Sequence, residues 1–76
     1  MRELISIEAI FPLTLKCKFN NNEIKVIDLN IIAEKPVFKF LLNDNDFKNF
    51  INKKYFIEWP TYEADLSADT LWHLGK

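Results

Sequence analysis

Residues 55–60 are YFIEWP and residues 61–72 are TYEADLSADTLW, and the rest of the chain is organised around this segment. Tyr55, Ile57 and Trp59 alternate with Phe56 and Glu58, which is the period of a β-strand, and a proline stops the strand at position 60. A turn should follow. The segment holds both tryptophans of the chain, so the upstream residues are expected to form the surface on which these rings pack.

The end of this segment predicts a short amphipathic helix. Ser67 is a good N-cap, Asp69 lies in the first turn, and Gly75 lies just past the last turn. Ala68, Leu71 and Trp72 would form the apolar stripe of the helix.

Three strands are predicted before this segment. Leu4 to Phe11 places Ile5, Ile7, Ala9 and Phe11 on one face, and Leu13 to Phe19 alternates Leu13, Leu15, Cys17 and Phe19 with polar residues. Glu23 to Leu29 continues with Ile24 and Val26 on one face, after a hairpin turn at Asn20 to Asn22. The three strands form a predicted antiparallel meander.

The middle of the chain is less regular. Asp28 can cap a turn or short helix around Leu29 to Glu34, which Pro36 ends. Val37 to Leu42 is either a short strand or an irregular buried link. The polar cluster at residues 43–46 then predicts the start of a helix whose apolar stripe is Phe47, Phe50 and Ile51.

These patterns predict the α+β class. We expect an antiparallel sheet of about four strands, made of the N-terminal three-stranded meander and one late strand, with two main helices on one face. With 76 residues, the chain should form a single domain over residues 1–76.

The composition excludes several classes of protein. A hydrophobic fraction of 49% and an aromatic fraction of 14% indicate a globular domain and not a disordered chain. A net charge of −1 argues against nucleic-acid binding by this chain. No apolar run is long enough to span a membrane, and no signal-peptide pattern is present, so we expect a cytoplasmic protein. Cys17, the only cysteine, is expected to be a buried, inert thiol.

An ordered set of residues along the chain resembles a known family. The residues that carry the resemblance are Leu15, Phe19, Asn22, Asp28-Leu29, Pro36-Val37-Phe38, Leu42, Asp44, Phe47, Ile57, Trp59-Pro60, Asp65-Leu66 and Asp69-Thr70-Leu71. The chain resembles the small bacterial family catalogued as domain of unknown function twenty-four forty-two, whose fold type is named after the N-terminal domain of a nitrifying bacterium's protein. Three departures from the family pattern are Asn21-Asn22 in place of Asp-Gly, one extra residue between Trp59 and Asp65, and Ala68 in place of a proline.

The resemblance implies a partner and no particular activity. Members of the family are often encoded beside another small protein in toxin–antitoxin-like pairs. This implies a protein–protein interaction module, with an antitoxin-like role as one form of it.

No residue pattern indicates catalysis, a cofactor or a metal. His73 is the only histidine, and helix capping explains Asp65 and Asp69 more simply than a metal pair does. The alternative function is an enzyme or small-ligand binder with a pocket near Glu58, Asp65 and His73.

The aromatic residues near the end of the chain favour binding of another protein. Trp and Tyr are enriched in binding hot spots, so the candidate partner-binding residues are Trp59, Tyr62, Asp65 and Trp72. Whether Trp59 and Trp72 lie in the core or on the surface stays open. A homodimer is also predicted, burying either the turn from Trp59 to Tyr62 or the edge of the first strand, where Glu8 is the only charge.

Overall fold

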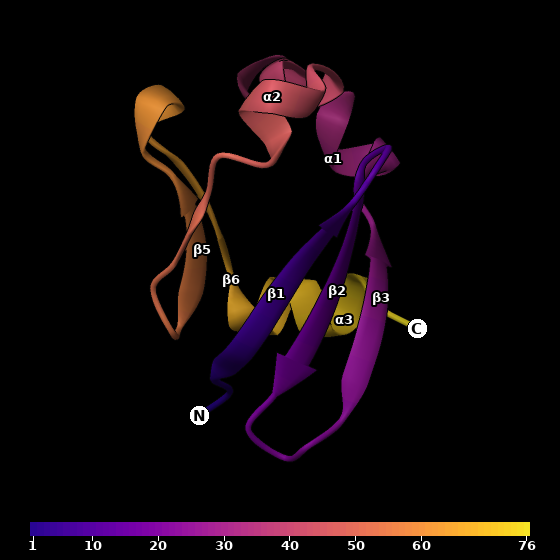
Figure 1. The fold of residues 1–76 in the computed structure, drawn as a ribbon, viewed down its shortest axis with the longest axis vertical. Helices are drawn as coiled ribbons and strands as arrows, with labels where there is room; N and C mark the ends of the chain where they lie inside the picture. The colour runs from indigo at the N-terminus through magenta and orange to yellow at the C-terminus, as the bar shows by residue number, and fades with distance from the viewer.

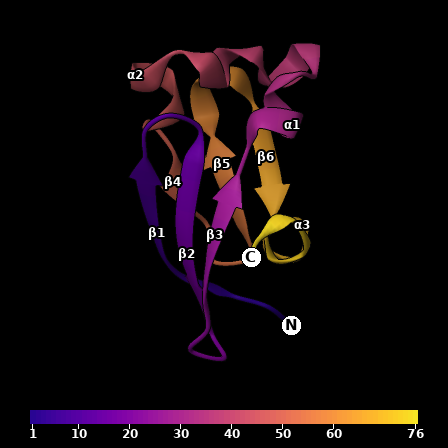
Figure 2. The ribbon, with the colours of Figure 1, turned by 90° about the vertical axis from the view of Figure 1, so that its right-hand side faces the viewer.

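The computed structural model describes residues 1–76 and contains two three-stranded antiparallel sheets. The first sheet has the order β1 (Leu4–Ile10), β2 (Thr14–Phe19) and β3 (Ile24–Asp28). The second has the order β4 (Ile51–Asn52), β5 (Phe56–Trp59) and β6 (Ala64–Ser67). Figure 1 shows the two sheets side by side, and Figure 2 shows the second sheet behind the first.

Helical segments lie at one end and along one side of the two sheets. Between the sheets the chain forms α1 (Asn30–Ala33), the 3-10 helix η1 (Pro36–Leu42) and α2 (Asp44–Phe47), which gather at one end (Figure 1). A short 3-10 turn, η2 (Pro60–Tyr62), joins β5 to β6. The last helix, α3 (Ala68–Leu74), lies beside β3 and β6 (Figure 2).

The α+β class and the N-terminal meander are confirmed, but the single sheet of about four strands is wrong. The two missed strands are β4, with two residues, and β6, whose four residues were expected to form a turn and a cap. Such short strands give almost no periodic signal. The prediction that two main helices cover one face is also wrong, because the helices occupy an end and a side of the molecule.

The core lies between the two sheets. The inward side chains of β2 and β3 meet those of β5 and β6, and α3 and the helical end close the remaining sides. Sixteen buried residues form one cluster, made almost entirely of aliphatic and aromatic side chains. Cys17 is among them with no exposed surface, as the sequence predicted, and burial raises the pKa of its thiol to about 12.

β1 faces the core differently from the prediction. The pairing of β1 with β2 shifts between Leu4 and Ser6, so the strand has a bulge there. The bulge turns Leu4 into the core, where it is 3% exposed, and leaves Ile5 54% exposed. The predicted face of Ile5, Ile7, Ala9 and Phe11 is therefore interrupted, because an extra residue reverses the alternation.

The predicted helix over Phe47, Phe50 and Ile51 ends after a single turn. Asn43 caps it as expected, since its side chain accepts hydrogen bonds from the backbone N–H groups of Asn45 and Asp46. The carbonyl of Phe47 then accepts a hydrogen bond from the indole Nε1 of Trp59 at 2.8 Å. A continuing helix would need this carbonyl for the N–H of residue 51, which instead belongs to β4.

The caps and turns predicted from short polar side chains are confirmed. Asn22 has a φ of 69° in the β2–β3 hairpin, and Ser67 accepts a hydrogen bond from the Thr70 N–H at the start of α3. Asp28 accepts a hydrogen bond from the Asn30 N–H at the start of α1, as predicted, although Leu29 and not Asp28 occupies the N-cap position. The segment from Val37 to Leu42 forms neither a strand nor an irregular link but the 3-10 helix η1. None of these helices has both the length and the apolar character needed to cross a membrane.

Candidate functional site

Aromatic rings gather where the helical end meets the second sheet. We define the aromatic surface as Phe38, Phe40, Phe50 and Tyr62. The rings of Phe38, Phe40 and Phe50 lie 5.8 to 6.4 Å from that of Trp59, in edge-to-face orientations. Trp59 is 1% exposed and forms the base of the surface, so its ring is a core residue and not a surface contact.

Tyr62 is the exposed member of the aromatic surface. Its ring stacks on that of Phe40 with a centroid distance of 4.1 Å and an interplanar angle of 4°. Its hydroxyl donates a hydrogen bond of 2.8 Å to Oδ2 of Asp46. This bond to a carboxylate, together with partial desolvation, raises the pKa of the Tyr62 hydroxyl. The side chain is held at both its ring and its hydroxyl and is still 44% exposed.

The local backbone presents Tyr62 in this position. Pro60 begins η2, and Glu63 ends it with a φ of 51°, a left-handed conformation that reverses the chain into β6. The turn thereby places the ring of Tyr62 over η1, a segment that is distant from Tyr62 in sequence.

Exposed aliphatic side chains lie on the same helical end. Ile31, Val37 and Leu42 are 68%, 70% and 64% exposed. Two of them line an open concavity of about 430 Å³ between α1 and η1, whose lining residues are Asn30, Ile31, Ala33, Glu34, Lys39 and Leu42. Large apolar side chains that stay exposed beside a shallow concavity are typical of protein-binding surfaces.

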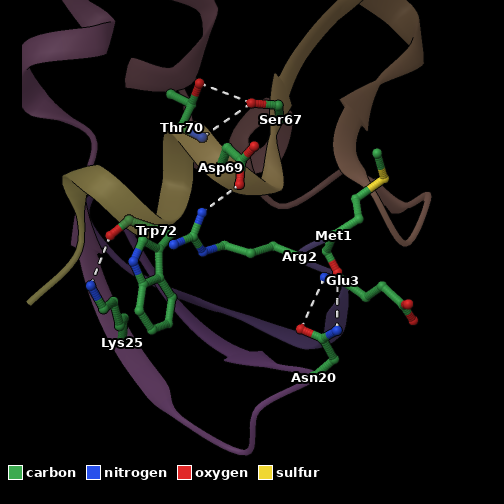
Figure 3. A network of polar contacts seen from close by, with 9 residues as sticks. All are labelled: Met1, Arg2, Glu3, Asn20, Lys25, Ser67, Asp69, Thr70 and Trp72. Carbon is green, nitrogen blue, oxygen red and sulfur yellow. Dashed lines mark hydrogen bonds and ion pairs between the residues drawn. The ribbon is translucent and has the colours of Figure 1, made fainter.

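Trp72 lies away from the aromatic surface, on α3 (Figure 1). Figure 3 shows its ring between two cations, the guanidinium of Arg2 at 4.7 Å and the ammonium of Lys25 at 3.8 Å from the ring centroid. Lys25 also donates a hydrogen bond of 2.9 Å to the Trp72 carbonyl, and Arg2 pairs with Asp69 at 2.6 Å. Phe19 packs edge-on against the same ring at 5.1 Å. These contacts fix α3 to the first sheet.

Asp65 and Glu58 are brought together, and His73 is not joined to them. Glu58 on β5 and Asp65 on β6 are directly opposite each other in the antiparallel register. No hydrogen bond or ion pair links His73 to either carboxylate, and none of the three residues lines any of the three surface concavities. The structure therefore does not form the pocket of the alternative function.

Of the aromatic surface, only Tyr62 is among the residues that the sequence predicts to bind a partner. Phe38 and Phe40 lie in the segment for which the sequence allows either a short strand or an irregular link, and Phe50 belongs to the apolar stripe of a predicted helix. The spacing of Phe38 and Phe40 was the available signal, but it is typical of a strand and gives no indication of a stack with a residue twenty-two positions away.

Comparisons with known proteins give one result. No curated protein and no solved structure matches the chain. One family model matches residues 4–76, and its description is "Protein of unknown function (DUF2442)". This confirms the resemblance seen in the sequence, and the chain belongs to this family of proteins of unknown function, DUF2442.

Proposed function

We propose that this chain is a non-catalytic cytoplasmic module that binds another protein, as an antitoxin-like partner of a small protein encoded beside it. The aromatic surface, with the exposed aliphatic side chains of α1 and η1, is the proposed binding surface. The proposal rests on the physical character of this surface.

The observation that carries the proposal is the fixed position of the exposed Tyr62. Binding normally costs the ordering entropy of the side chains that meet the partner. Here the stack on Phe40 and the hydrogen bond to Asp46 order the tyrosine before any partner arrives. An exposed aromatic side chain that is already ordered has the properties of a binding hot spot.

Co-expression with the neighbouring gene product, followed by co-purification, tests the proposal. Tyr62→Ala should weaken the complex by at least about tenfold, since hot-spot truncations cost about 2 kcal/mol or more. The chain offers a matched control in Tyr55, which is 43% exposed against 44% for Tyr62 and lies outside the aromatic surface. Tyr55→Ala should leave the complex intact. If Tyr62→Ala and Tyr55→Ala bind the partner equally well, the aromatic surface is not part of the interface.

A further inference from the structure

The edges of the first sheet are protected unequally. At the β3 edge, the N–H and C=O of Val26 exchange hydrogen bonds with the backbone of Lys76 at 3.2 and 3.1 Å. At the start of β1, the N–H of Leu4 donates to the Lys54 carbonyl and the C=O of Leu4 accepts from the Asn52 side chain. No such partner follows along β1, which is the longest strand of the protein.

The register identifies the backbone groups left free on β1. In β2, the bonds between Phe19 and Glu23 and between Leu29 and Leu13 show that its odd-numbered residues bond to β3. Its even-numbered residues therefore bond to β1, where their partners are Ser6, Glu8 and Ile10. The N–H and C=O groups of Ile7 and Ala9 must point outward. The same alternation points Val26 outward on β3, where it meets Lys76.

We propose that this outer edge of β1 pairs with the same edge of a second copy of the chain, in antiparallel orientation about a twofold axis at Glu8. Ile7 then lies opposite Ala9 of the second copy, and Ala9 lies opposite Ile7 of the second copy. Every free group of the two residues gains a backbone hydrogen bond, and the first sheet of one copy becomes continuous with the first sheet of the other. This interface is distinct from the aromatic surface.

The lysines beside the edge can offset the one like-charge contact that a second copy creates. The pairing brings Glu8 opposite Glu8 of the second copy, which would be unfavourable alone. Each edge, however, adjoins a concavity of about 330 Å³ lined by Ser6, Ile7, Glu8, Lys16, Lys18 and Ile24. It contains two lysines for one carboxylate, and none of the three is in an ion pair.

Across the twofold axis, two carboxylates therefore meet four lysines. Neighbouring strands are about 4.8 Å apart, so a lysine on β2 can extend over β1 toward the carboxylate of the second copy. The lysines of each copy can thereby offset the repulsion between the two glutamates.

The mass of the protein in solution tests the pairing. Light scattering at micromolar concentration should give twice 9.0 kDa. Ala9→Pro should give a monomer, because proline removes an outward N–H and leaves the bonds of Glu8 and Ile10 to β2 in place. Val26→Pro is the matched control: it also changes an outward position of the same sheet, but at the edge that Lys76 covers, and should remain a dimer.

A second pair of variants avoids the backbone altogether. Lys16→Gln with Lys18→Gln should raise the dimer dissociation constant by about tenfold, the sum of several exposed charge interactions. Lys35→Gln with Lys48→Gln makes the same change of charge away from this sheet and should have no effect. Amide exchange should also slow at Ile7 and Ala9 as the protein concentration rises.

Three results would overturn the pairing. The first is a protein that stays monomeric at every concentration. The second is an Ala9→Pro variant that is folded and still dimeric. The third is a dimer that Tyr62→Ala dissociates and Ala9→Pro does not. If the protein is always a monomer and Ala9→Pro abolishes its co-purification with another protein, the β1 edge binds an extended segment of that other protein.

Discussion

The ring of Tyr62 lies parallel to the ring of Phe40, with the two centroids 4.1 Å apart. One residue comes from the turn between two strands and the other from the 3-10 helix at the end of the molecule. The stack joins η2 to η1, and the Tyr62–Asp46 hydrogen bond joins η2 to α2, although strand pairing links none of these segments.

The Tyr62–Asp46 bond should be visible in a phenolate titration. Asp46→Asn removes the carboxylate whose hydrogen bond, and to a smaller extent whose charge, raises the pKa of Tyr62, so part of the phenolate absorbance should move to lower pH. Because the folded-state pKa is raised, the contribution of this bond is complete below the unfolded pKa. It is lost as the pH rises through the folded pKa. Tyr62→Phe should abolish the component that moves, and an unchanged titration in Asp46→Asn would contradict the assignment.

Replacing Trp59 by phenylalanine should destabilise the fold by about 2–3 kcal/mol, since it leaves a cavity and an unpaired Phe47 carbonyl. Urea unfolding measures the change. Trp72→Phe is the comparison: it also loses an indole, but Trp72 donates no indole hydrogen bond and is only partly buried, so it should cost less. Equal costs would show that the indole bond of Trp59 contributes nothing.

Cys17 should resist thiol reagents in the folded protein at mildly alkaline pH, because its pKa is raised to about 12 and its side chain has no exposed surface. The raised pKa also sets a direction for stability. The contribution is complete below the ordinary value of 9.0 and declines as the pH rises toward 12, where the unfolded chain ionises first. Labelling should follow the rate of unfolding in urea, and Cys17→Ala should remove this part of the pH dependence. Rapid labelling of the native protein would contradict the burial.

Arg2→Gln should loosen α3 by about 0.5–1 kcal/mol, through the loss of an exposed ion pair and one cation over Trp72. Trp72 fluorescence is measured in a Trp59→Phe background, and its spectrum should change when Arg2 is replaced by glutamine. Added salt screens the Arg2–Asp69 pair, so the spectrum of the chain that keeps Arg2 should then approach that of Arg2→Gln. Lys54→Gln, which removes the other exposed ion pair of the protein, is the control and should leave the Trp72 signal unchanged.

Gly75→Ala should cost about 1–3 kcal/mol, because an added methyl group would lie 2.8 Å from Cβ of Lys25 and 3.1 Å from Cγ1 of Ile27. The glycine allows close approach to β3, so the Lys76–Val26 backbone pair should open in the variant. Faster amide exchange at Val26 is the measurement. Lys76→Ala, which changes only a side chain beyond the contact, should leave that exchange slow.

The sequence was most informative where the structure is local. The alternation of β2, the positive φ of Asn22 and the Ser67 cap depend on neighbouring residues, and all could be predicted. The division into two sheets could not, because it depends on β4, with two residues, and on β6, whose strand character comes from pairing with β5. Tertiary pairing decides the state of segments this short.

The same limit explains what was missed at the aromatic surface. The Trp59 indole ends the helix after Phe47 by taking its carbonyl, and this contact joins residues twelve positions apart. The 3-10 conformation of Val37 to Leu42 places Phe40 under Tyr62, although the segment contains residues that favour strands. Periodicity cannot report contacts of this kind.

Arg2 and Asp69 form an ion pair across sixty-seven positions of the sequence, and this has a consequence for synthesis on the ribosome. Translation delivers β1 to β3 well before β5, β6 and α3, so the inner face of the first sheet has no cover until these later elements leave the exit tunnel. The meander can pair early, but the core closes only once residues near Trp72 are free to reach Arg2 and Lys25. The inner face of the first sheet therefore stays uncovered from the emergence of β3 to the emergence of α3, and during this interval a chaperone or a partner protein can reach it.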